Sequence, residues 1–237
     1  MTKLIITRPM EDAAPLAAAL ASMGVETMSA PLMSIEIKPG PQPDLSGVQA
    51  LLFTSANGVR AFAARSSARD IPVYAVGNAT ARISKDLNFS HVISANGDVD
   101  DLAALVCNAC SPADGELFHA CASVVAGDLS GALAARGFRV ARHVLYEAKA
   151  AAALPGDMIR AIRDRNAHGV IVYSPRTAHI LDALLEDADL SEAASEMKLF
   201  ALSQNVNTAS TSKWHERIIA AHPCQESLLE AVQSCYY

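Results

Sequence analysis

The segment Leu51-Leu52-Phe53-Thr54-Ser55-Ala56-Asn57 begins as an apolar run and ends in small polar residues that can start a helix. The same pattern recurs in residues 4–9, 73–80, 170–176 and 199–205. In an open sheet of parallel strands, such junctions lie at the carboxyl edge, where ligands bind. The first turn of a helix there offers unpaired N–H groups and a partial positive charge, which suit carboxylates and phosphates. The five junctions therefore predict a ligand with several negative groups.

Short apolar runs alternate with helix-like stretches along the whole chain. This alternation predicts an α/β fold in which parallel sheets carry helices on both faces. Ten strands are expected, more than one sheet comfortably holds, so we predict two doubly wound five-stranded sheets. The strands are expected to begin near Lys3, Val25, Ala50, Pro72, His91, Glu116, Phe138, Gly169, Lys198 and Arg217.

Two stretches interrupt the alternation and mark the expected domain boundaries. Residues 35–39 and 142–149 look like exposed strands, and the first leads into a stiff proline-rich spacer. If the two strands pair, they form a two-stranded β-ladder that joins the domains. One α/β domain would then be discontinuous and consist of residues 1–34 and 150–237. The other would be inserted and comprise residues 40–141.

The composition is typical of a globular enzyme or binding protein and excludes several other classes. Of the 237 residues, 51% are hydrophobic and 19% are charged, as in a folded chain. The net charge of −6 argues against a nucleic-acid partner, because a basic face is the usual footprint. No apolar run approaches the length of a membrane span, so we expect none. Acidic residues directly follow the short first strand, so we do not expect a signal peptide. The 5 cysteines suit a reduced compartment, so we expect a cytoplasmic protein.

Motifs for nucleotides, metals and nucleophilic catalysis are missing from the sequence. The chain has neither a GxGxxG after its first strand, nor a P-loop, nor a GxSxG elbow. Cys107 and Cys110 form a CxxC, but the pair ends an expected helix rather than starting one, where redox pairs lie. The sequence has no second CxxC and no HxxxH that could complete a zinc site with this pair. We therefore expect no cofactor and no metal.

Taken in order, the junctions resemble those of the uroporphyrinogen-III synthase family. The resemblance covers essentially the whole chain with the family's spacing, and each piece alone is weaker than the ordered set. The matching pieces are Thr7-Arg8-Pro9, residues 53–59, residues 76–81, residues 144–148, Tyr173-Ser174-Pro175-Arg176, and Pro223 with Leu228-Leu229. The resemblance implies two α/β domains joined by a two-stranded ladder, with one domain inserted in the other.

The resemblance also implies a reaction in tetrapyrrole, or haem, biosynthesis. The family closes the linear tetrapyrrole hydroxymethylbilane into a macrocycle and inverts its last pyrrole ring, as a hydro-lyase that needs no cofactor. Loss of the terminal hydroxyl as water gives an electrophilic azafulvene, which the substituted carbon of the last ring attacks to form a spiro intermediate. The substrate carries eight carboxylates, in agreement with the polar junctions. We expect a monomer that binds neither nucleic acid nor membrane.

The same resemblance assigns the candidate site. Tyr146 matches a tyrosine of the family's linker strand and is expected to donate a hydrogen bond or proton to the departing hydroxyl. Packing on a half-exposed strand is the alternative role for Tyr146. Capping of helix N-termini is the alternative for most of the others, although a cap leaves further N–H groups for a carboxylate. The expected substrate-binding residues are Arg8, Ser55, Asn57, Gly77, Asn78, Thr80, Ser174, Arg176 and Ser203.

The sequence departs from the family at two places. Residues 203–209 stand where a glycine-containing turn is more common, and residues 119–123 replace a more usual Arg-Gly pattern. We therefore leave residues 119–123 out of the predicted site. Two other functions remain open: a non-catalytic two-domain protein that binds a small molecule, and an inactive paralogue that keeps only the fold.

Overall fold

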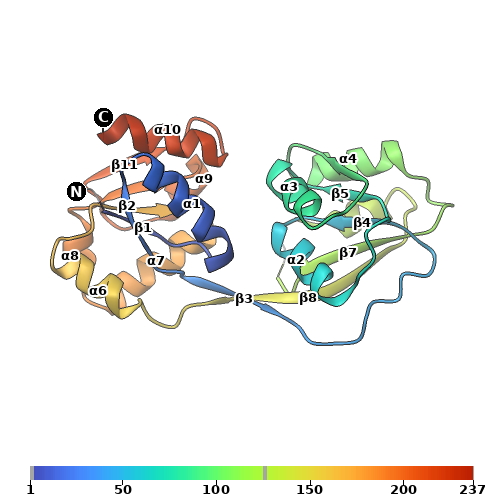
Figure 1. The fold of residues 1–237 in the computed structure, drawn as a ribbon, viewed down its shortest axis with the longest axis horizontal. Helices are drawn as coiled ribbons and strands as arrows, with labels where there is room; N and C mark the ends of the chain where they lie inside the picture. The colour runs from blue at the N-terminus through green and yellow to red at the C-terminus, as the bar shows by residue number, and fades with distance from the viewer. Residues whose placement is uncertain (1–2, 125–126, 237) are drawn as a thin grey trace. The chain divides into compact units, whose positions relative to one another are not determined.

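A computed structural model describes residues 3–124 and 127–236 of the chain. It divides into two compact α/β units, each with its own sheet and helices (Figure 1). The first unit is made of Met1–Ser34 and Lys149–Tyr237, and the second of Ile35–Ala148. Within the described ranges, no helix is both long and apolar enough to cross a lipid bilayer.

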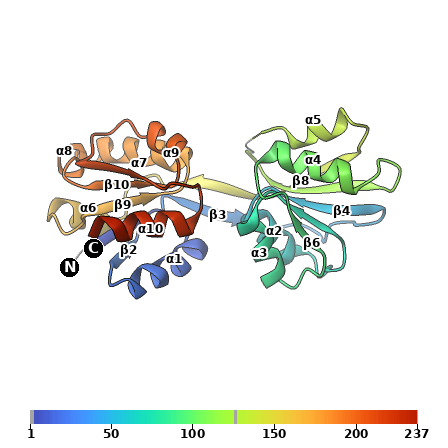
Figure 2. The ribbon, with the colours of Figure 1, turned by 90° about the horizontal axis from the view of Figure 1, so that it is seen from above.

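The first unit is built on a five-stranded sheet in the order β11-β10-β9-β1-β2, and its paired strands are parallel. Helices α1 and α10 pack on one face through Leu16 and Leu228, and α6, α7, α8 and α9 cover the other (Figure 2). The strands are β1 (Lys3–Ile6), β2 (Glu26–Ser29), β9 (Gly169–Val172), β10 (Lys198–Ala201) and β11 (Glu216–Ile219). The helices are α1 (Met10–Ser22), α6 (Gly156–Arg163), α7 (Pro175–Asp187), α8 (Ser191–Ala194), α9 (Gln204–Ala209) and α10 (Gln225–Tyr236).

The second unit is built on a six-stranded sheet in the order β3-β8-β7-β4-β5-β6. Helices α2 and α3 pack on one face, where Phe62 meets Phe118 edge to face, and α4 and α5 cover the other. The strands are β3 (Met33–Ile37), β4 (Val48–Phe53), β5 (Val73–Ala75), β6 (Val92–Ser94), β7 (Glu116–Ala122) and β8 (Val140–Ala150). The helices are α2 (Ala56–Arg65), α3 (Asn78–Asp86), α4 (Val99–Ala109) and α5 (Leu129–Ala134).

The sheets confirm the predicted α/β class but correct the strand count. The first sheet has the expected five strands, whereas the second has six. The additional strand is β3, which lies next to β8, as expected for the two ladder strands, but belongs to the sheet and does not form a separate ladder. Directly after β3, Lys38 N donates a hydrogen bond of 2.8 Å to the carbonyl of Leu145 in β8. The second expected ladder strand, residues 142–149, makes up most of the eleven-residue β8, which also pairs with β7. Half-exposed residues along β8 made it look like part of an isolated strand pair, although it lies between β3 and β7 in a six-stranded sheet.

A side-chain clamp in the first unit holds the chain after α9, the helix that begins after Ser203. Asp182 on α7 accepts hydrogen bonds from Ser210 Oγ at 2.9 Å and from Ser212 N at 3.1 Å. Arg217 donates to the carbonyls of Ser210 at 3.0 Å and Ser212 at 2.6 Å. Trp214 Nε1 donates to Ser210 Oγ at 2.9 Å. The loop is therefore fixed from both sides by charged groups.

Replacing Asp182 with alanine should lower the free energy of unfolding of the first unit by about 2 kcal/mol. The variant leaves several donors of the loop without their charged acceptor, and hydrogen bonds to charged groups contribute more than neutral ones. Trp214 is the only tryptophan of the chain, so its fluorescence reports this unit during urea unfolding. Asp182→Asn keeps the shape and is the control, with a smaller expected loss. An unchanged transition in Asp182→Ala would show that the clamp is dispensable.

Candidate functional site

The carboxyl edge of the second sheet brings together the starts of two helices. Strands β4 and β5 are parallel neighbours in which Phe53 pairs with Ala75, and Val76 N donates to the carbonyl of Phe53 at 3.0 Å. Ser55 and Gly77 follow these strands and are the N-caps of α2 and α3. Two of the predicted junctions therefore lie side by side at one edge, as the rule for parallel sheets requires.

Ser55 makes two contacts at this edge, one of them with the predicted catalytic tyrosine. Its Oγ accepts a hydrogen bond from Gly58 N at 3.2 Å and so caps α2. The same oxygen lies 2.7 Å from the hydroxyl of Tyr146, which is 91 residues away in the sequence. Either hydroxyl can be the donor. The structure thus joins the helix cap and the tyrosine into one hydrogen-bonded pair.

An irregularity in β8 directs Tyr146 into this position. The register of β7 and β8 shifts by one residue between the pairs Cys121–Val144 and Ala122–Tyr146. Such a bulge turns two consecutive side chains toward the same side, and Leu145 and Tyr146 are indeed both buried in one cluster. The neighbouring position on β7 holds only the small Ala122. Tyr146 can therefore reach past β7 toward Ser55 at the end of β4.

Close packing of α2 on β7 sets the place of Ser55. A Cβ atom on Gly58 would lie 2.8 Å from the carbonyl oxygen of Ala120, nearer than such atoms approach in real proteins. Glycine at this position lets the first turn of α2 lie directly against the strand. Since Gly58 N is also the donor to Ser55 Oγ, its close approach fixes the cap as well.

The environment of Tyr146 keeps its phenol protonated. Only 6% of the residue is exposed, so Tyr146 is buried and not half-exposed as its alternative packing role assumed. Burial raises the pKa of Tyr146, and the hydrogen bond with Ser55 opposes this rise. The side chain is therefore a neutral hydroxyl at physiological pH and can donate a hydrogen bond or a proton.

The other predicted residues of this unit have separate partners. Asn57 Oδ1 accepts from Arg60 at 2.8 Å, and Asn78 Nδ2 donates to Asn96 Oδ1 at 2.6 Å. The sequence did not single out Asn96, because nothing local to it indicates that β6 ends beside α3. Thr80, Gly77 and Asn78 were expected to cap one helix together: Gly77 is the N-cap of α3, whereas Thr80 lies within the helix with 5% of its surface exposed.

Three further junctions share the carboxyl edge of the first sheet. Strands β1, β9 and β10 are neighbours, and Arg8, Ser174 and Ser203 follow them. Ser174 Oγ accepts from Thr177 N at 3.1 Å and caps α7. Ser203 Oγ accepts from Val206 N at 3.4 Å and caps α9. The predicted capping role of both serines is thus observed, and their role toward a substrate stays a prediction.

Arg8 is held in place by groups of its own unit. Its guanidinium lies 3.0 Å from the carboxylate of Asp12 and 4.2 Å from the ring centroid of Tyr173. Burial raises the pKa of Tyr173 to about 12, against the charge of Arg8. Tyr173 was not among the predicted site residues, although it directly precedes Ser174. Arg176 is exposed in the first turn of α7.

The comparisons with known proteins give the family. The sequence model of the family described as uroporphyrinogen-III synthase HemD matches residues 14–230. The chain belongs to this family. The family resemblance expected from the junctions is thereby confirmed, and it places the chain in tetrapyrrole biosynthesis. None of the curated proteins compared with the chain matches it.

Solved structures of synthases share the fold. The chain is similar to uroporphyrinogen-III synthetase from Helicobacter pylori, with 17% identity and a TM-score of 0.66, over 99% of this chain and 100% of that one. It is also similar to a mutant uroporphyrinogen III synthase from the extremely thermophilic bacterium Thermus thermophilus, with 18% identity and a TM-score of 0.56, over 99% and 100%. At these identities the likeness supports the fold alone.

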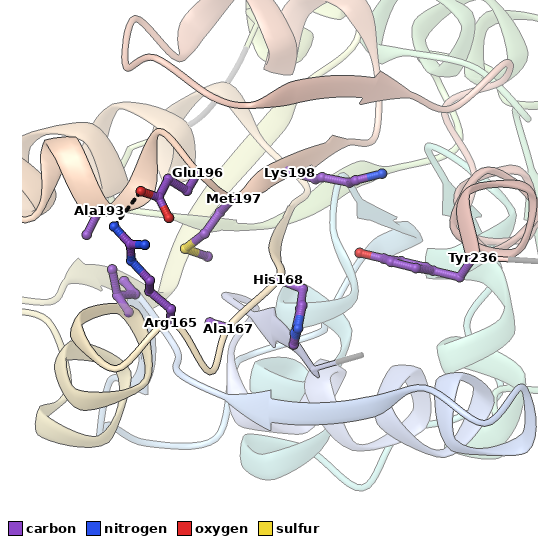
Figure 3. A pocket seen from close by; sticks show the side chains of 9 residues that line it. Arg165, Ala167, His168, Ala193, Glu196, Met197, Lys198 and Tyr236 are labelled. Atoms are coloured by element: carbon purple, nitrogen blue, oxygen red, sulfur yellow. Dashed lines mark hydrogen bonds and ion pairs between the residues drawn. The ribbon is translucent and has the colours of Figure 1, made fainter. Parts of the chain in front are cut away.

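A pocket in the first unit lies away from the predicted site. It has a volume of about 210 Å³ and lies at the amino ends of β9 and β10, between Arg165, His168, Lys198 and Tyr236 (Figure 3). Predicted substrate-binding residues do not line it. Ligand pockets usually measure about 300–1,000 Å³, so this one is small for a linear tetrapyrrole. Among the described residues, no group of three or more His, Cys, Asp or Glu could hold a metal ion.

His119, in the segment left out of the predicted site, is buried in the second unit. It is 2% exposed, and its Nε2 lies 3.4 Å from Thr54 Oγ1. Burial, together with the charge of Arg142, lowers the pKa of His119 to about 4. The ring is therefore neutral in the folded protein at pH values where an unfolded chain would bind a proton.

Lowering the pH from 7 to 5 should reduce the stability of the second unit by about 2 kcal/mol through His119. The folded pKa lies below the unfolded value of about 6.5, so this contribution is complete above that value and is lost as the pH falls toward 4. Urea unfolding followed by circular dichroism at both pH values measures it. His119→Gln should remove this part of the pH dependence. His143→Gln, at a ring stacked on Phe118, is the control and should retain most of it.

Proposed function

We propose that the protein is a hydro-lyase that closes hydroxymethylbilane to uroporphyrinogen III, with inversion of the last pyrrole ring and loss of water. Family membership supports the substrate and the product. The observation that carries the site assignment is the contact between Ser55 and Tyr146, which puts a neutral phenol at the carboxyl edge of a parallel sheet. The monomeric state and the cytoplasmic location of the protein stay predictions.

Tyr146 assists the departure of the hydroxyl group in this proposal. The carbon–oxygen bond breaks with its electron pair on oxygen, and a proton from the phenol completes the leaving water. Ser55 Oγ accepts from Gly58 N, so its own proton can point to the phenol oxygen. In that arrangement the proton of Tyr146 is available to the substrate. Ser55 therefore acts as a positioning residue for the tyrosine.

Polar groups at the strand ends bind the carboxylates of the substrate. Gly77 provides no side-chain cap for α3, so the first N–H groups of this nine-residue helix can face an anion. Asn57, Asn78 and Thr80 belong to the same proposed region. In the first unit we assign Arg8, Ser174, Arg176 and Ser203 to this role. Local N–H groups and arginines are needed because the net charge of −6 does not attract an anionic substrate.

Selection between two ring closures is the main task of these contacts. Closure without inversion proceeds spontaneously, so the protein must favour the geometry that leads to the spiro intermediate. A hundredfold preference requires only about 2.7 kcal/mol between the two transition states. Orientation of a bound chain can supply this amount without an additional catalytic group.

Purified protein should convert hydroxymethylbilane mainly to the type III isomer in the presence of a metal chelator and without added cofactor. Chromatography of the oxidised porphyrins separates types I and III, and a reaction without protein gives the spontaneous type I background. If folded protein yields only type I, the synthase assignment is wrong. Tight binding of hydroxymethylbilane without turnover would then favour the small-molecule binding protein. If the protein does not bind it at all, the inactive paralogue would be favoured.

A further inference from the structure

Lys198 and Cys235 form a close pair outside the proposed active site. Lys198 begins β10 and Cys235 lies in the last turn of α10, and Nζ is 2.9 Å from Sγ. Glu216 Oε2 lies 2.8 Å from the same Nζ, and the ring centroid of Tyr236 is 5.5 Å away. Figure 3 shows Lys198 and Tyr236 extending toward the same space beside the small pocket. The amine and the sulfur are thus held together by groups from β11 and α10.

Small reagents can reach this pair from solvent. The side chain of Lys198 is 24% exposed and lines the pocket, and Cys235 is only partly buried. The contacts with Cys235 and with Glu216 raise the pKa of Lys198, so the amine carries a proton at neutral pH. A positive charge therefore stands beside the sulfur, and the thiolate is the form of cysteine that reacts with oxidants.

We propose that Lys198 and Cys235 are a modification site at which a peroxide creates a covalent bond between Nζ and Sγ. In the first step the thiolate attacks the peroxide, a sulfur–oxygen bond forms and the oxygen–oxygen bond breaks. The Lys198 ammonium gives its proton to the departing hydroxide, which leaves as water. The products are a sulfenic acid on Cys235 and a neutral amine on Lys198.

The second step joins the two side chains. The neutral amine attacks the sulfur, a nitrogen–sulfur bond forms and the sulfur–oxygen bond breaks. The hydroxide leaves with a proton of the amine as a second water. Sulfenic acids condense with nitrogen in this way, and a thiol can reverse the reaction by attacking the sulfur. The bond ties α10 to the sheet at β10, across 37 residues of sequence.

Hydrogen peroxide treatment followed by digestion and mass spectrometry tests the proposal. The expected product contains the peptides of Lys198 and Cys235 joined, at about 2 Da below their summed masses. Dithiothreitol should release both peptides unmodified. Sulfinic or sulfonic acid on Cys235 without a joined peptide, at peroxide levels that modify the other cysteines, would overturn the proposal.

Two variants and a second readout separate the bond from general oxidation. Lys198→Arg keeps the positive charge but lacks the amine, so the joined peptide should vanish and Cys235 should remain oxidisable. Cys224→Ser removes an exposed cysteine of the same unit and should leave the joined peptide unchanged. The oxidised wild-type protein should also melt at a higher temperature than the reduced one, because a cross-link restricts the unfolded chain. An equal shift in Lys198→Arg would contradict the assignment to this pair.

Discussion

Replacing Tyr146 with phenylalanine should slow formation of the type III isomer by about a hundredfold while the protein stays folded. A lost general acid typically reduces the rate by about 10²–10⁴, and an enzyme that acts mainly by orientation should lie at the low end. The ring of Tyr146 still fills its place among the buried residues around Phe53 in the variant. Single-turnover assays with hydroxymethylbilane measure the rate, and circular dichroism verifies the fold.

The partner of Tyr146 supplies the matched experiment. Ser55→Ala removes the contact with the tyrosine and also the cap of α2, whereas Asp128→Ala removes a cap of α5 outside the proposed site. If Ser55 positions the phenol, the effects of Ser55→Ala and Tyr146→Phe on the rate should combine to less than their product. A wild-type rate in Tyr146→Phe would remove the tyrosine from the mechanism. Complete loss of type III formation in folded Tyr146→Phe would mean that proton transfer contributes more to the rate than orientation does.

Gly58→Val should destabilise the second unit by about 3 kcal/mol or more and reduce type III formation even where the protein remains folded. The new side chain would overlap the carbonyl of Ala120, and backbone cannot move aside as a flexible side chain can. Helix α2 would have to lift from β7, which takes Ser55 away from Tyr146. Urea unfolding by circular dichroism and the isomer ratio of the product measure the two effects.

Another glycine in a helix start provides the control for Gly58. A Cβ on Gly156, the first residue of α6, would meet nothing within 4 Å. Gly156→Val should therefore change stability by no more than about 1 kcal/mol, within the range of intrinsic helix propensity. Equal losses in the two variants would mean that the β-branched residue itself, and not the contact with Ala120, is responsible.

Buried parallel strands were predictable because each forms a continuous apolar run. Strands β4 and β9 are buried on both sides, so Leu51-Leu52-Phe53 and Val170-Ile171-Val172 carry their own signal. The pairing of β3 with β8 was expected, but its continuity with the second sheet was not predictable, because exposed alternation does not indicate whether a strand pair stands alone or extends a larger sheet. The sequence therefore predicts the class of the fold better than the width of each sheet.

The candidate site divides in the same way. Serines that follow apolar runs predicted the caps of α2, α7 and α9, since capping depends on local sequence. The contact of Ser55 with Tyr146 joins residues 91 positions apart and depends on a bulge that has no local signature. Thr80 was misplaced because a threonine near a helix start resembles a cap until the first residue of the helix is known.

The position of β1 inside its sheet imposes an order on synthesis at the ribosome. Strand β1 lies between β2 and β9, and Leu4 pairs with Gly169. The second unit, Ile35–Ala148, is continuous and can complete its sheet while the polypeptide is still being extended. Strand β1 must wait for β9, which follows the inserted unit, and one edge of β1 stays unpaired in the meantime. The nascent segment that contains β1 is therefore a stretch for which protection by a chaperone matters.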